Sequence, residues 1–157
     1  MNSRDSIRST RRSVIAWQRL TRSHQQISRR EREALAPYNL TTAQFDILSQ
    51  LSRNPGLSQQ ALAGRLLVTK GNICGLIDRL ETAGLVERQD TPDDRRSYQL
   101  FLTPNGKALF EQAVPALEQE LTSIFSKFTE DELTNLSGLL TRLDNNNPLS
   151  ISTPLEA

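Results

Sequence analysis

The residues best suited to contact a charged ligand are two adjacent arginines, Arg95 and Arg96, in the segment 89–97 (QDTPDDRRS). Proline and aspartate favour a turn, so we predict that this segment is a loop with the arginine pair at its tip. Guanidinium groups on a thin loop can enter a narrow DNA minor groove, where negative potential is concentrated. Asp94 could hold the guanidinium group of Arg96 in place. Taken alone, the loop would be interpreted as a solvated charge cluster, so its meaning depends on the elements around it.

A second group of candidate contacts lies on a helix predicted from Thr69 to Thr82. Thr69 can cap its first turn, apolar residues recur along one face, and Gly84 can supply a left-handed end. The opposite face carries two glycines, which cost roughly 1 kcal/mol each relative to alanine but allow close approach to another surface. The alternative explanation is that the two glycines have no function and arose by evolutionary drift on a solvent-exposed face. Lysine can reach a phosphate, and asparagine can pair with a base edge. The candidate contacts of this helix are therefore Lys70, Gly71, Asn72, Gly75 and Arg79.

Both groups are predicted to be positioned by a winged helix-turn-helix that runs from Leu57 to Thr103. Ser58 can cap a short helix, and a turn joins this helix to the one with the two glycines. Two strands follow at residues 85–86 and 98–102, the second with alternating apolar residues. Residues 56–57 could add a third strand. The apolar side of the short helix is predicted to consist of Ala61, Leu62 and Leu66.

This segment resembles the MarR family of bacterial winged-helix repressors over roughly residues 12–143. The matching stretches are the wing pattern D-x-R-x5-L-T, the helix pattern TKGNICGLIDRLETAGLVERQ and LTTAQFDIL upstream. The resemblance implies a ligand-responsive homodimer that binds a pseudo-palindromic operator in double-stranded DNA, with a recognition helix in the major groove and a wing in the minor groove of each half-site. By position, Arg96 is similar to the arginine of the family's wing that enters the minor groove. Asp94 is similar to the acidic residue that holds this arginine in place. The resemblance also implies DNA contacts at Ser58, Gln59, Thr69, Lys70, Gly71 and Asn72.

Long helices are predicted on either side of this segment, so the expected fold is mainly α with a small β wing. Apolar stripes on the terminal helices exceed what the winged helix can cover, which suggests a subunit interface. Pro115 should kink or divide the helix that starts at Pro104. We predict a flexible N-terminus at 1–10, one domain at 11–145 and a tail at 146–157. Within the domain, the predicted DNA-binding lobe spans about 40–103, and the predicted dimerisation helices span about 5–36 and 104–145.

Composition excludes several other classes. One Cys and one His among 157 residues allow neither an intrachain disulfide nor a zinc site of ordinary ligand count. We find no nucleophile motif, phosphate-binding loop or metal cluster, so we predict no enzyme activity and no cofactor. No apolar run approaches the ~20 residues that span a bilayer, and no secretory signal is evident, so a cytoplasmic protein without a membrane partner is expected. The net charge is only +1, but arginines crowd the first third, which can still present a cationic surface.

Three hypotheses concern signals and alternative functions. A small aromatic effector could bind between the first, second and fifth helices, with Trp17, Tyr38 and Phe45 as its walls. Cys74 lies on the predicted recognition helix, where a thiol near the positive helix start could be oxidisable, so a redox sensor is one alternative. A small side chain that fills a partly buried position is the simpler explanation of Cys74. A winged-helix module for protein–protein contact is the other alternative function.

Overall fold

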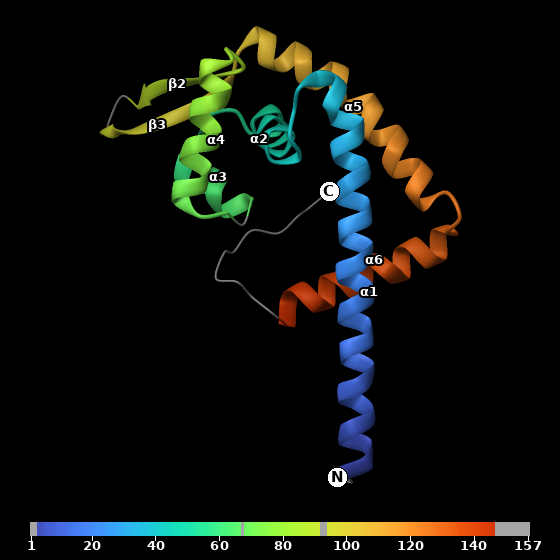
Figure 1. Ribbon diagram of the computed structural model, residues 1–157. Helices are drawn as coiled ribbons and strands as arrows, with labels where there is room; N and C mark the ends of the chain where they lie inside the picture. The colour runs from blue at the N-terminus through green and yellow to red at the C-terminus, as the bar shows by residue number, and fades with distance from the viewer. Residues whose placement is uncertain (1–2, 67, 92–93, 147–157) are drawn as a thin grey trace.

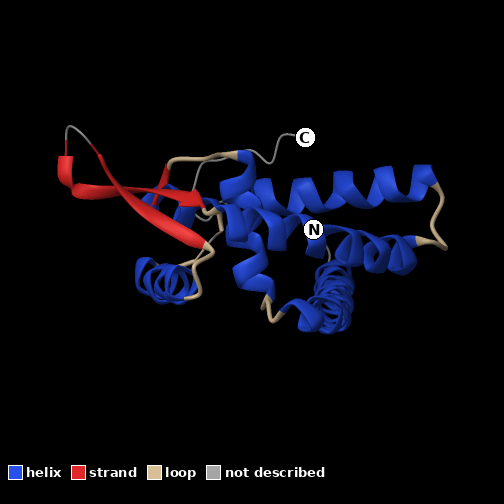
Figure 2. Ribbon diagram, turned by 90° about the horizontal axis from the view of Figure 1, so that it is seen from above, coloured by secondary structure: helices blue, strands red, loops and turns tan. Residues whose placement is uncertain are grey.

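Helices form most of the structure, and a small antiparallel sheet projects from one side of them (Figures 1 and 2). The computed structural model describes residues 3–66, 68–91 and 94–146, and the side chains of residues 3–9, 70, 91 and 94–97 lie outside this description. The elements in chain order are α1 (Ser3–Leu35), η1 (Ala36–Tyr38), α2 (Thr42–Arg53), β1 (Leu57–Ser58), α3 (Gln59–Arg65), α4 (Lys70–Thr82), β2 (Val86–Thr91), β3 (Asp94–Leu102), α5 (Pro104–Phe125) and α6 (Glu130–Asn146). A helix-rich fold with a small β wing is therefore confirmed.

Hydroxyl side chains cap the helices of the predicted DNA-binding lobe. The side-chain oxygens of Thr41, Ser58, Thr69 and Thr103 each accept a hydrogen bond from the backbone N–H three residues further on, at the starts of α2, α3, α4 and α5. Such caps satisfy N–H groups that have no partner inside the helix, and each contributes about 1 kcal/mol. The caps predicted at Ser58 and Thr69 are confirmed, and all four caps explain why these helices begin where they do.

The core lies where α2, α4 and the sheet meet the end of α1 and the first half of α5. Leu35 of α1, Ile47 of α2 and Leu100 of β3 are fully buried. The rings of Phe45 and Phe110 pack with their centroids 5.2 Å apart and so join α2 to α5. In α3 the prediction was partly wrong, because Ala61 is exposed and Ala63 is buried instead. Ala63 follows Leu62 on the side of the short helix that meets the core, whereas Ala61 lies outside it.

The sheet has the strand order β1-β3-β2, and both pairings are antiparallel. Gly56 N–H donates to the Leu100 carbonyl at 2.9 Å, directly before Leu57 pairs with Leu100, so the expected third strand is present. The predicted loop at 89–97 is wrong, because β2 continues to Thr91 and β3 begins at Asp94. Arg95 and Arg96 therefore belong to a strand and do not form the tip of a loop.

The register of the β2–β3 hairpin shifts where this prediction failed. Asp90 pairs with Tyr98, but Thr91 pairs with Asp94, so β3 carries three more residues than β2 between these two pairs. A bulge of this kind bends and twists a hairpin while the strands continue. The apolar alternation that marks Tyr98 to Leu102 in the sequence stops at the bulge, which is why the strand extension was not predicted.

Helix α5 runs unbroken past Pro115, so of the two predicted outcomes, a kink or a division, the division does not occur. Pro115 is exposed, while Ala113 is buried and Leu117 packs against the core. Proline removes one helical hydrogen bond, but on the outer side water can satisfy the carbonyl that loses its partner. Figure 1 shows α5 curving along its length around the lobe.

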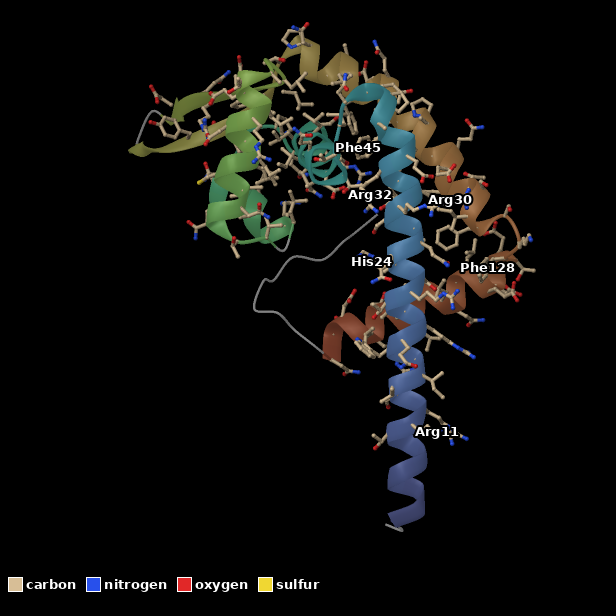
Figure 3. All side chains as sticks on the ribbon, viewed as in Figure 1. Arg11, His24, Arg30, Arg32, Phe45 and Phe128 are labelled. Carbon is tan, nitrogen blue, oxygen red and sulfur yellow. The ribbon has the colours of Figure 1, made fainter. Side chains whose placement is uncertain are left out.

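An ion pair ties α5 to α1. The guanidinium group of Arg30 donates to Glu120, and its Nη2 donates to Ser123 Oγ at 3.1 Å. Figure 3 shows Arg30 on the side of α1 that faces α5, whereas Arg11 lies on the part of α1 that extends away from the lobe. This pair and the buried Leu35 anchor the second half of α1, whereas residues 10–20 of α1 are all exposed.

The predicted segments at the two chain ends are described only in part. Helix α1 begins at Ser3, inside the predicted segment 1–10, and residues 147–157 of the predicted tail lie outside the described residues. The proposed domain boundaries remain a prediction. No helix in the described ranges is long and apolar enough to cross a bilayer.

Candidate nucleic-acid interface

Helix α4 is held on the core by one face and leaves the opposite face open. Ile73, Ile77 and Leu80 are fully buried, at the i, i+4, i+7 spacing that the sequence predicts. The six exposed residues on and beside the other face are Gly71, Asn72, Asp78, Arg79, Glu81 and Thr82. A Cβ atom added at Gly71 or at Gly75 would meet nothing within 4 Å. Packing within the chain therefore does not require glycine at either position, and both mark a flat strip of exposed helix.

Helix α3 supports α4 from the other side of the turn. Gln59 Nε2 donates to Cys74 Sγ, and both residues are half-buried. Two candidate contacts are thus already engaged within the protein, since Ser58 caps α3 and Gln59 bonds to α4. Thr69 likewise accepts from Asn72 N–H at 3.3 Å. The bond from Gln59 to Cys74 holds the start of α3 against the first half of α4.

The hairpin of β2 and β3, here called the wing, projects from the lobe beyond the helices (Figure 2). The wing starts at the end of α4 and lies beside that helix in Figure 1. The side chains of Asp94, Arg95, Arg96 and Lys70 lie outside the described residues, so their contacts stay predictions. Their backbone positions place the first three on β3 and Lys70 at the first position of α4.

Arg88 joins the wing to α4, and sequence reasoning missed this residue. Its guanidinium group donates to Asp78 and to Glu81, both on α4. Burial by itself lowers the pKa of Arg88, but the hydrogen bonds and charges of Asp78 and Glu81 outweigh burial and raise that pKa above its usual value. A signal was available, because Arg88 lies two residues after the buried Val86 and therefore points to the same face of its strand.

The predicted effector walls are not brought together within one chain. Phe45 is buried against Phe110, and Tyr38 is half-buried at the edge of the same core. Trp17 is 64% exposed on the uncovered half of α1. The 18 residues from Trp17 to Leu35 at the end of α1 correspond to about 27 Å of helix. Of the three residues, only Tyr38 and Phe45 belong to the same core.

Asp46 of α2 has its pKa raised by burial and by the nearby Glu31 carboxylate of α1. In the described part of the chain no cluster of three or more His, Cys, Asp or Glu residues could hold a metal ion. The chemistry available at the interface is therefore that of backbone amides, hydroxyl groups, amides and cations, which suits phosphates and base edges.

A capped helix-turn-helix followed by a projecting antiparallel hairpin defines a winged helix-turn-helix DNA-binding protein. Comparison with known proteins gives the family. The MarR family profile matches residues 38–97. An uncharacterized HTH-type transcriptional regulator from Bacillus cereus is 34% identical over 130 residues, which are 82% of this chain and 86% of that protein. The chain belongs to the MarR family.

Solved structures give the same result. A cysteine-to-serine mutant of MarR from Escherichia coli, complexed with operator DNA, is 29% identical and superposes with a TM-score of 0.77, covering 83% of this chain and 95% of that chain. The transcriptional repressor CouR, bound to a 23-mer DNA duplex, is 30% identical with a TM-score of 0.71, covering 82% and 89% of the two chains. The protein is thus a DNA-binding transcription regulator and not an enzyme.

Proposed function

We propose that the protein is a homodimeric repressor that binds a pseudo-palindromic operator, with α4 in the major groove and the wing in the minor groove of each half-site. The observation that carries this proposal is the open face of α4, which holds Gly71 and Gly75 with free space around both and lies beside a projecting wing. The proposed place of action is the cytoplasm, where DNA lies in a bacterial cell. The proposed DNA contacts are Ser58, Gln59, Thr69, Lys70, Gly71, Asn72, Gly75, Arg79, Asp94, Arg95 and Arg96.

Uncovered apolar surface supports the proposed homodimer. Large hydrophobic side chains are exposed on the first half of α1 and on α6, and α6 buries none of its residues. Isolated exposed hydrophobic residues are ordinary, but a run of them along two helices marks an interaction surface. The residues concerned are Val14, Ile15, Trp17, Leu20, Leu139, Leu140 and Leu143. A second copy of the chain would cover them and would double the winged helix with two-fold symmetry.

The direct test is selection of bound duplexes from a random pool. We expect an enriched inverted repeat whose half-sites are about 10 bp apart, or a multiple of this, because one helical turn separates equivalent grooves. Absence of any enriched duplex at low ionic strength would overturn the proposed function and would favour a module for protein–protein contact. An enriched site without symmetry would overturn the proposed dimer.

On the selected duplex, Arg96→Ala should weaken binding by about tenfold to a hundredfold, because minor-groove and base contacts are each worth roughly 1–3 kcal/mol. Lys70→Ala should weaken binding to all duplexes and reduce the salt slope by about 1, because one phosphate contact is lost. Fluorescence anisotropy over a series of salt concentrations measures both effects. Lys127→Ala, in the exposed connection between α5 and α6, is the matched control and should bind as the wild type does. Equal affinity of all three variants would refute these contacts.

We further propose that a small aromatic acid is the effector and that Tyr38 and Phe45 contact it. At a hundredfold excess over Kd, such a ligand would add about 2.7 kcal/mol to stability and raise the melting temperature by about 5–10 °C. A thermal-shift screen with benzoate-like and phenylacetate-like acids measures this, and cyclohexanecarboxylate serves as the non-aromatic control. Equal shifts with the control would argue against an aromatic site, and no shift with any acid would remove the effector hypothesis.

A further inference from the structure

Two carboxylates lie on or beside the face of α4 that is proposed to meet DNA. Asp78 follows Gly71 and Gly75 on one side of the helix, since residues three, four and seven apart share a face, and 62% of its side chain is exposed. Glu81 lies one turn further, nearer to β2, and is 40% exposed. Phosphate groups carry one negative charge each and would repel both carboxylates. A surface that binds DNA therefore needs these two charges compensated.

Arg88 supplies the compensation from the wing. Its Nη2 donates to Asp78 Oδ1, and its Nη1 donates to Glu81 Oε2, so one guanidinium group bridges both carboxylates. Only 21% of the Arg88 side chain is exposed, which is far less than for either partner. In the ladder Arg88 pairs with the buried Leu100 and therefore points from the sheet toward α4. A lysine could not replace it fully, because an ammonium group lacks the planar fork that holds two acceptors.

We propose that Arg88 is a positioning residue for DNA binding: it acts through Asp78 and Glu81 by neutralising their charge beside the face of α4 that meets DNA. This inference rests on the proposed function above and names the device that makes the surface acceptable to phosphates. Arg88 acts through the two carboxylates, since most of its side chain is covered by the protein. Removing its charge would leave two uncompensated anions on or beside the surface that faces DNA.

The test uses the full chain and the duplex selected from the random pool. Arg88→Met keeps an unbranched apolar stem but removes the charge, and it should weaken binding by about tenfold at low salt. The difference from the wild type should shrink as salt rises, because screening weakens repulsion between exposed charges. A residue that only stabilises the fold would not change the salt dependence in this way. Adding Asp78→Asn and Glu81→Gln to Arg88→Met should restore affinity to within about threefold of the wild type, because the repulsion is gone.

Two further variants make the result decisive. Asp78→Asn with Glu81→Gln in the wild-type background frees the charge of Arg88 and should bind DNA at least as tightly as the wild type, with a steeper salt slope. Lys127→Met, which removes one exposed positive charge in the connection between α5 and α6, should leave binding unchanged. The inference is overturned if Arg88→Met binds like the wild type, if the triple variant stays as weak as Arg88→Met, or if the carboxylate double variant binds more weakly. If Arg88→Met does not fold, the triple variant decides alone. Failure of the wild type to bind any duplex would instead refute the proposed function.

Discussion

Replacement of Gly106 by alanine is expected to destabilise the protein by at least about 3 kcal/mol and to lower its melting temperature by roughly 10 °C or more. An added Cβ atom at Gly106 would lie 1.9 Å from the Leu85 carbonyl oxygen and 2.8 Å from the Leu85 carbonyl carbon. These are backbone atoms, so no side-chain rotation can relieve the overlap. The start of α5 would have to move away from the chain segment that leads into the wing.

Neighbouring hydrogen bonds hold both partners of this close contact in place. Thr103 N–H donates to the same Leu85 carbonyl at 3.1 Å, and Thr103 Oγ1 donates to the Gly84 carbonyl at 2.6 Å. Thr103 Oγ1 also accepts from Gly106 N–H at 3.0 Å, which caps α5. Moving Gly106 outward would therefore break the cap or the link to Leu85, and buried groups that lose their partners cost about 1–3 kcal/mol each.

Gly138→Ala in α6 is the matched control for this prediction. An added Cβ atom there would meet nothing within 4 Å, and the residue is exposed. Because alanine favours a helix interior by about 1 kcal/mol over glycine, this variant should melt at a slightly higher temperature than the wild type. Thermal unfolding followed by circular dichroism measures the melting temperatures of both variants. An unchanged melting temperature for Gly106→Ala would mean that α5 does not approach Leu85 as closely as described.

The features that sequence alone predicted are those set by local chemistry. The hydroxyl residues three positions before Ala61, Asn72 and Gly106 predict helix starts, because the hydrogen bond between the cap and the backbone spans only three residues. The apolar spacing of Ile73 and Ile77 shows which face of α4 is buried, because a helix repeats every 3.6 residues. The open face of the candidate site followed from the same periodicity.

The features that were missed depend on contacts between distant segments. Nothing local distinguishes Gly106, which must approach Leu85, from Gly71, which has free space around it. Arg88 acquires its role only when the wing folds back beside Asp78. The extension of β3 to Asp94 depends on its partner strand, since charged residues carry little strand preference of their own. Contacts of this kind can be identified only once the fold is known.

Placing two glutamates on α6, by Leu139→Glu with Leu143→Glu, is expected to convert the proposed dimer into monomers and to weaken operator binding by about a hundredfold or more. Both leucines are exposed in the single chain, at 60% and 44% respectively. Burying a leucine side chain is worth about 1.5–3 kcal/mol, so two buried on association would contribute several kcal/mol to the dimer. Two charges in their place would also have to be desolvated. A monomer meets one half-site alone and loses the gain in effective concentration that linked half-sites provide, which is commonly a factor of 10²–10⁴.

Thr134→Glu is the control, because Thr134 is exposed on the polar side of the same helix and the change adds one glutamate there. It should leave both assembly and binding intact. Light scattering coupled to size exclusion measures the mass, and Trp17, the only tryptophan, reports on α1 independently. Its side chain is 64% exposed in one chain, so its emission should lie at shorter wavelength in the dimer than in the double variant. If the double variant remains dimeric, or if monomers bind the operator as tightly as the wild type, α6 does not form the interface through which the two half-sites are read together.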